Sequence, residues 1–127
     1  MNEAETRAFY IDPALKEAGW GVTDGSKIRM EFNISKGRLI GNGKRSAPDK
    51  ADYVLQYRNR NLAVIEAKSD EKYYTEGVGQ AKDYAQRLQV RFTYSSNGIQ
   101  TYGIDLIKGT EGDVTAYPTP DELWKMT

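Results

Sequence analysis

The sequence contains no cysteine and no histidine among its 127 residues. Without cysteine, the chain can form neither a disulfide framework nor a thiolate metal site, which fits a cytoplasmic protein. Without histidine, acid–base and metal chemistry that depends on imidazole is excluded. Any hydrolytic chemistry must therefore depend on carboxylates, lysine and a bound metal ion.

The chain also lacks a long apolar run and a net charge. No segment approaches the roughly 20 apolar residues that span a bilayer, and no signal peptide precedes the first predicted helix, so we expect no membrane partner. The 18 basic and 18 acidic residues cancel. A neutral chain is a poor free-standing DNA binder, which counts against an autonomous nuclease and is expected if another domain or subunit delivers the DNA. The length fits a single domain, residues 1–127, with a hydrophobic core.

The most informative stretch covers residues 51–69. Two short apolar runs, residues 53–57 and 62–67, flank a polar segment, and this pattern predicts a β-hairpin. Asp52, Glu66 and Lys68 interrupt the apolar pattern near the open end of that hairpin. Charges on a core strand are costly unless they are paired or bind a metal ion, so this cluster needs an explanation.

The pairing register of the hairpin supplies one. A turn with an odd number of residues would pair Asp52 with Lys68 and Val54 with Glu66. Asp52 and Glu66 would then be diagonal neighbours on one face, about 7–8 Å apart, and could share a divalent cation. A turn with an even number of residues would place them on opposite faces. We predict the odd register, with the Ala67 carbonyl as a third oxygen ligand.

This arrangement predicts a phosphodiester hydrolysis site. Carboxylate and carbonyl oxygens are the ligands that Mg²⁺ or Mn²⁺ prefers, and such an ion lowers the pKa of bound water. Lys68 would hold or deprotonate the attacking water, or offset charge on the phosphate. The alternative is a surface hairpin with an ordinary cross-strand ion pair between Asp52 and Lys68, worth about 0.2–1 kcal/mol.

The rest of the pattern predicts alternating helices and strands. Residues 2–18 and 75–90 have helical spacing, and Asp12 before Pro13 predicts a kink or a break in the first helix. The predicted strands, besides the hairpin, are residues 28–34, 91–94, 99–105 and 114–117. A basic, glycine-rich loop at residues 41–50 is either solvated or in contact with DNA phosphates.

Asp52 followed by Glu66-Ala67-Lys68 resembles the signature of the PD-(D/E)xK nucleases. The chain is more specifically similar to the N-terminal nuclease domain of the restriction (R) subunit of type I restriction–modification enzymes. One departure is that Ala51 precedes the first acidic residue, while the proline lies at Pro48. The segments that carry the resemblance are residues 5–7, 11–13, 18–20, 51–55, 63–68, 80–81, 84–85, 94–98 and 118–124.

The resemblance implies a restriction-endonuclease-like α/β fold, with a central mixed sheet of about four or five strands flanked by helices. It implies Mg²⁺-dependent cleavage of double-stranded DNA, with Mn²⁺ as a substitute. Gln80 and Tyr84, four residues apart on one helix, would support catalysis by hydrogen bonding. Glu5 would be a third acidic residue near the metal; the alternative is a solvated glutamate that the dipole of the first helical turn favours.

The resemblance also implies a larger parent complex. No phosphate loop of the Gly-x-x-x-x-Gly-Lys-Ser/Thr type occurs here, so ATP would act only in the parent complex, on motor domains of the same subunit. The methyltransferase and specificity subunits would be further partners. Two alternatives stay open: a stand-alone repair or modification-dependent nuclease of the same fold, and a catalytically silent nucleic-acid- or protein-binding module.

Overall fold

The computed structural model describes residues 1–34, 39–40, 44–45 and 49–127. A helical run at the N-terminus is followed by strands, one long helix, three further strands and a last short helix. The elements are α1 (Glu3–Thr6), η1 (Arg7–Ile11), α2 (Asp12–Glu17), β1 (Ser26–Asn33), β2 (Leu39–Ile40), β3 (Lys44–Arg45), β4 (Lys50–Tyr57), β5 (Arg60–Ala67), α3 (Val78–Leu88), β6 (Phe92–Ser96), β7 (Thr101–Asp105), β8 (Thr110–Val114) and α4 (Pro120–Met126).

The main sheet has six strands in the order β1-β4-β5-β6-β7-β8. All neighbours are antiparallel except β5 and β6, which are parallel because α3 connects them. The prediction of a mixed sheet is confirmed, but the predicted number of four or five strands is too low. The last strand was also misplaced at residues 114–117, since β8 spans Thr110–Val114.

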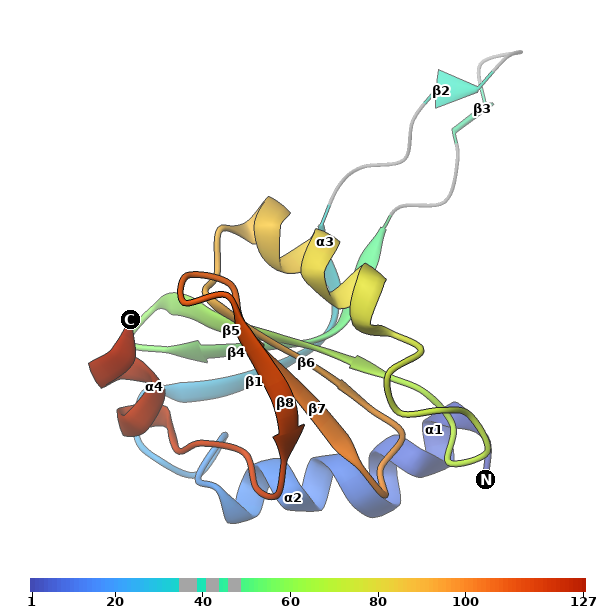
Figure 1. Ribbon diagram of the computed structural model, residues 1–127. Coiled ribbons are helices and arrows are strands. Elements are labelled where there is room, and N and C mark those ends of the chain that lie inside the picture. The colour runs from blue at the N-terminus through green and yellow to red at the C-terminus, as the bar shows by residue number, and fades with distance from the viewer. Residues whose placement is uncertain (35–38, 41–43, 46–48) are drawn as a thin grey trace.

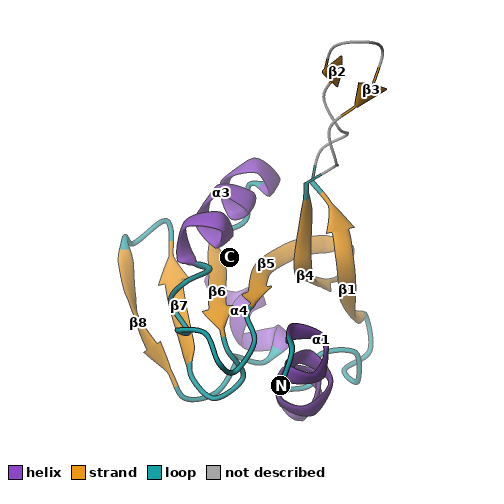
Figure 2. Cartoon of the chain, turned by 90° about the vertical axis from the view of Figure 1, so that its right-hand side faces the viewer, coloured by secondary structure: helices purple, strands orange, loops and turns teal. Residues whose placement is uncertain are grey.

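Helices cover both faces of this sheet (Figure 1). α3 lies over one face, while the N-terminal helical run and α4 lie on the other. Figure 2 shows the same layers from the side, with the β2–β3 pair extending away from the main sheet. No helix in the described ranges has the length and apolar character that crossing a bilayer requires.

Each helical layer encloses its own hydrophobic core. Val54 and Val64 pack against Tyr84 and Ala85 on the α3 side. The larger core lies on the other side of the sheet. It contains Ile11, Leu15, Trp20, Tyr53, Leu55, Tyr57, Leu62, Ala63, Ile65, Ala67, Phe92, Tyr94, Tyr117 and Leu123. Alternate residues of β4 therefore face different cores, as a strand buried on both faces requires.

The N-terminal helical run is not broken at Asp12. The side chain of Asn2 caps α1, and the backbone of Asp12 is helical. Just before Pro13 the chain forms a π-helical turn, η1. In this turn the Asp12 amide donates to the Arg7 carbonyl five residues earlier. Proline has no amide hydrogen, so a widened turn before it accommodates the ring without ending the helix.

Candidate active site

The hairpin of β4 and β5 has an even turn, contrary to the odd turn predicted above. Tyr57 pairs with Arg60, so only Arg58 and Asn59 lie in the turn. Both have left-handed backbones, with φ of 52° and 64°. Two consecutive residues with positive φ form a type I′ turn, whose twist matches that of the strands it joins.

A two-residue turn alone would place Asp52 and Glu66 on opposite faces of the sheet. A β-bulge in β5 returns them to the same face. Gln56 pairs with Asn61, whereas Leu55 pairs with Ala63, so Leu62 is an extra residue on β5. Beyond this bulge Val54 faces Val64, and the register is two residues away from the predicted pairing of Val54 with Glu66. Asp52 and Glu66 therefore approach each other across the hairpin, while the predicted pairing of Asp52 with Lys68 is wrong.

Side-chain hydrogen bonds replace the backbone ladder where Asp52 and Glu66 meet. The Asp52 amide donates to Glu66 Oε2 at 2.8 Å, and the Ala67 amide donates to Asp52 Oδ2 at 2.7 Å. Each carboxylate thus accepts a hydrogen bond from the backbone of the opposite strand. This reciprocal pair holds both carboxylates at the end of the β4–β5 ladder, with Asp52 next to the amide of Ala67.

Burial disfavours the ionised form of both carboxylates and raises their pKa values. Glu66 is only 3% exposed, and burial together with the Asp52 charge raises its pKa to about 8. Burial also raises the pKa of Asp52, although the Ala67 amide and the charge of Arg7 oppose that shift. Two neighbouring buried carboxylates with raised pKa values are stabilised when a cation binds them both.

The strand end of β5 and the start of α3 position Lys68. Its amide donates to the Ser96 carbonyl at 2.8 Å, which continues the parallel pairing to β6. Gly77, just before α3, lies so close that a methyl group there would be 3.3 Å from Glu66 Cβ and 3.5 Å from Lys68 Cε. The Lys68 charge also lowers the pKa of Glu66. Glu66 and Lys68 therefore lie together beneath the first turn of α3.

Gln80 and Tyr84 project from α3 as a bonded pair. Gln80 Nε2 donates to the Tyr84 hydroxyl at 2.7 Å. Tyr84 is buried against Val54 and Val64, and the charge of Glu66 contributes to its raised pKa. The sequence-predicted pair is thus together on the face of the sheet that carries Glu66.

Glu5 takes part in the cap of the first helix. Its side chain accepts from the Asn2 amide and completes the capping box of α1. The neighbouring acidic residue Glu3 instead contacts Arg7, which in turn binds Asp52. The nearest acidic neighbours of the Asp52–Arg7 contact are therefore Glu3 and Glu31, and the Glu5 expectation finds no support in this geometry.

The donor set fits a small divalent cation. Asp52, Glu66 and the Ala67 carbonyl are the oxygen donors of the predicted site. Within the described ranges, no group of three or more carboxylate, histidine or cysteine side chains comes together to hold a metal. A cation here would need water or phosphate oxygens to complete its shell, which suits Mg²⁺, since Mg²⁺ commonly keeps several waters.

Known proteins match this chain over nearly its full length. No family model matches. The endonuclease subunit of the type I restriction enzyme EcoAI from Escherichia coli is 32% identical over 136 aligned residues, which cover 98% of this chain. A solved HsdR subunit fragment of a type I restriction enzyme from Vibrio vulnificus YJ016 is 38% identical, with a TM-score of 0.91 over 98% of this chain. The chain is a homologue of the R (HsdR) subunit of type I restriction enzymes.

The R-subunit homology extends over a small part of each relative. The chain spans 16% of the Escherichia coli subunit and 25% of the solved Vibrio chain. The resemblance inferred from residues 5–124 is thereby confirmed at the level of the subunit, and the α/β architecture agrees with that of the solved fragment.

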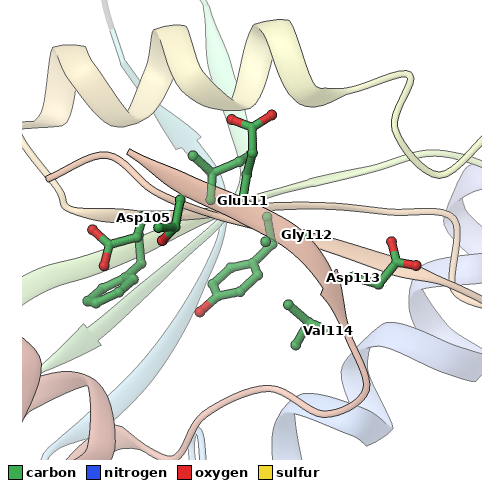
Figure 3. Close-up of a pocket in the computed structure, with 10 residues that line it drawn as sticks. Asp105, Glu111, Gly112, Asp113 and Val114 are labelled. Carbon is green, nitrogen blue, oxygen red and sulfur yellow. The ribbon is translucent and has the colours of Figure 1, made fainter. Parts of the chain in front are cut away.

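A hollow elsewhere on this R-subunit homologue carries none of the predicted site residues (Figure 3). It lies over β6, β7 and β8 and is lined by residues that include Tyr94, Asp105 and Val114. Arg91 binds Asp105 at 2.9 Å and lowers its pKa to about 2. The carboxylates of Glu111 and Asp113 bind Lys82 and Tyr74 instead. The acidic groups at this hollow are therefore already paired.

Sequence reasoning missed Arg7 as a member of the site. Arg7 Nη2 donates to Asp52 Oδ1 at 2.5 Å, across 45 residues of sequence. The only available signal was its place in residues 5–7, one of the segments that carry the family resemblance. The predicted DNA-contacting loop, residues 41–50, falls largely outside the described residues.

Proposed function

We propose that this chain is a Mg²⁺-dependent endonuclease domain that hydrolyses DNA phosphodiester bonds within a type I restriction–modification system. The observation that carries the proposal is the reciprocal bonding of Asp52 and Glu66 to the backbone of the opposite strand, with Glu66 buried and Asp52 partly buried, beside Lys68. Homology to the endonuclease subunit of a type I restriction enzyme supports the same class of reaction.

Asp52, Glu66 and the Ala67 carbonyl would hold the metal ion. Mg²⁺, or Mn²⁺ in its place, would supply a Lewis acid for the phosphoryl oxygen and lower the pKa of bound water. Because protonated Glu66 is a poor ligand, its carboxyl must release its proton before it binds the ion. The raised pKa of Glu66 would therefore couple metal binding to proton release below about pH 8.

Lys68, Gln80 and Tyr84 would act on the substrate and the attacking water, not on the metal ion. The ammonium group of Lys68 would orient the attacking water and offset negative charge that develops on the phosphate. Gln80, already bonded to Tyr84, would direct a hydrogen bond toward Lys68 or the phosphate. These residues lie on the same side of the sheet, since Gln80 and Tyr84 project from α3 and the Lys68 side chain lies close to Gly77 just before α3.

Double-stranded DNA would reach this site through other parts of the enzyme. The chain has no net charge, so it has little general attraction for the phosphate backbone. Motor domains of the same subunit, which use ATP, and the methyltransferase and specificity subunits would deliver the DNA. We expect this assembly to work in the cytoplasm.

Plasmid cleavage tests this proposal. Wild type, Asp52→Asn and Lys68→Ala would be incubated with supercoiled plasmid and either Mg²⁺, Mn²⁺ or EDTA, after circular dichroism confirms that each is folded. We expect nicking by the wild type with metal only, and a loss of at least about a hundredfold in both variants. Equal nicking by Asp52→Asn would contradict the assigned site. If the isolated chain is inactive, the same variants are compared in the complete enzyme.

A further inference from the structure

Arg7 lies at the centre of three carboxylates in this structure. Nη1 contacts Glu31 at 2.5 Å, while Nη2 contacts Glu3 at 2.9 Å and Asp52 at 2.5 Å. The Arg7 side chain is only 13% exposed and lies 5.8 Å from the centre of the Tyr53 ring. The guanidinium is therefore held from several sides, and its position does not depend on one exposed ion pair.

The local backbone is unusual on both sides of this contact. Arg7 opens the π-helical turn η1, and π turns often occur at functional sites. Across from it, Glu31 has a left-handed backbone with φ of 52° in the middle of β1, a conformation that costs energy for a residue other than glycine. Arg7 Nε is also buried without a partner among the described residues.

Resting on the function proposed above, we propose that Arg7 is a positioning residue for Asp52, which holds this carboxylate in place before the divalent cation arrives and competes with the cation for its charge. Arg7 binds Oδ1 while the Ala67 amide binds Oδ2, so both oxygens are oriented in the metal-free protein. A cation on Asp52 must then share Oδ1 with a guanidinium that carries charge of the same sign. The two cations therefore weaken each other's binding.

The sign of the effect on metal affinity separates this role from a merely structural one. If Arg7 only supported the fold, its loss would leave metal affinity unchanged or reduce it. If Arg7 is the resident counter-cation, a neutral side chain leaves the carboxylates of Asp52, Glu3 and Glu31 without compensation, and a divalent ion should bind more tightly. Lysine retains the charge but cannot contact three carboxylates with a planar fork.

The test is calorimetric titration of the metal-free protein with Mn²⁺, without DNA. The variants are Arg7→Gln, Arg7→Lys and Asp52→Asn, with Arg91→Gln as a matched control. Arg91 forms a similarly buried ion pair with Asp105, with 14% of the Arg91 side chain exposed, away from the site. Melting curves with EDTA accompany each titration and report the stability of the metal-free fold.

We expect Arg7→Gln to bind Mn²⁺ about tenfold more tightly than the wild type, and Arg7→Lys to stay within about twofold. Arg7→Gln and Arg91→Gln should both melt at a lower temperature in EDTA, while Arg91→Gln keeps wild-type Mn²⁺ affinity. Unchanged or weaker Mn²⁺ binding by Arg7→Gln would overturn the proposal, as would absence of binding in both it and the wild type. Wild-type Mn²⁺ affinity in Asp52→Asn would instead overturn the metal site of the proposed function.

Discussion

At the scale of single residues, the candidate site depends on two neighbouring carboxylates that are largely removed from solvent. Glu66 is nearly inaccessible and has Asp52 beside it, so the charged form is disfavoured. A core strand tolerates this only because backbone amides and Arg7 supply hydrogen bonds. The same unfavourable burial is what makes these residues useful, since a bound cation would relieve it.

Glu66 should make the metal-free protein less stable as the pH rises. Its pKa is raised from 4.5 to about 8 on folding, so its stabilising contribution is complete below pH 4.5 and is lost as the pH rises through about 8. Glu66→Gln should remove this dependence and stabilise the protein at pH 9 by on the order of 3 kcal/mol.

Urea unfolding in EDTA between pH 5 and pH 9 would measure this dependence. The exposed Glu17→Gln variant is the control and should retain the slope of the wild type between pH 6 and pH 9. A Glu66→Gln curve parallel to that of the wild type would show that Glu66 does not titrate in this range.

Gly77 is needed because side chains crowd the space above it. A methyl group at this position would lie 2.9 Å from Ser95 Oγ and 3.3 Å from Glu66 Cβ. We expect Gly77→Ala to destabilise the protein by about 1–3 kcal/mol and to displace Glu66 or Lys68. Thermal melting and Mn²⁺ affinity would measure the two effects.

Gly79 is the matched control, because nothing lies within 4 Å of a methyl group placed there. Gly79→Ala should stabilise the protein by about 0.4–1 kcal/mol, through the lower entropy of its unfolded chain. If both alanine variants melted alike, the close packing described for Gly77 would be incorrect.

At the scale of elements, the site depends on two compensating irregularities in one hairpin. The two-residue turn at Arg58 and Asn59 would place Asp52 and Glu66 on opposite faces, and the bulge at Leu62 returns them to the same side. Because side chains alternate along a strand, either irregularity alone would separate the two carboxylates. The π turn of η1 acts similarly, since it places Arg7 toward Asp52 without ending the helix.

The turn should respond in opposite directions to two substitutions of one residue. Asn59 has φ of 64°, which glycine adopts freely and β-branched residues avoid. Asn59→Gly should leave stability unchanged or raise it by about 0.5 kcal/mol, whereas Asn59→Val should lower it by about 1–3 kcal/mol. Denaturant unfolding of both variants measures the difference. Equal stability of the two variants would mean that the turn is not of type I′.

At the scale of the whole molecule, the chain provides a site but little attraction for DNA. Its 18 basic residues are matched by 18 acidic ones, and several of the arginines, such as Arg87 and Arg91, are paired with aspartates. The chain also corresponds to only 16% of its Escherichia coli relative. Both observations agree with the division of labour proposed above, in which this domain would cut DNA and other parts of the enzyme would bind and move it.

The sequence by itself determined the α/β class, the hairpin, the α3 helix and the family. Local apolar periodicity and a spaced motif carry that information, and both can be read without knowing which segments meet. The mixed sheet, the core residues of the hairpin and the Gln80–Tyr84 pair on α3 were predicted for this reason. The predictions that Asp52, Glu66 and the Ala67 carbonyl bind a metal still await a measurement.

Only the tertiary structure decided the register, the sixth strand, the continuous N-terminal helix and the position of Arg7. One residue more in the turn, or one extra residue in a bulge, shifts the strand register and reverses the face on which each side chain lies. Apolar runs such as residues 62–67 fit more than one such pairing. Arg7 and Asp52 are separated by 45 residues, so no local pattern relates them. Their contact exists because η1 packs across the end of β4, and that packing is a property of the whole fold.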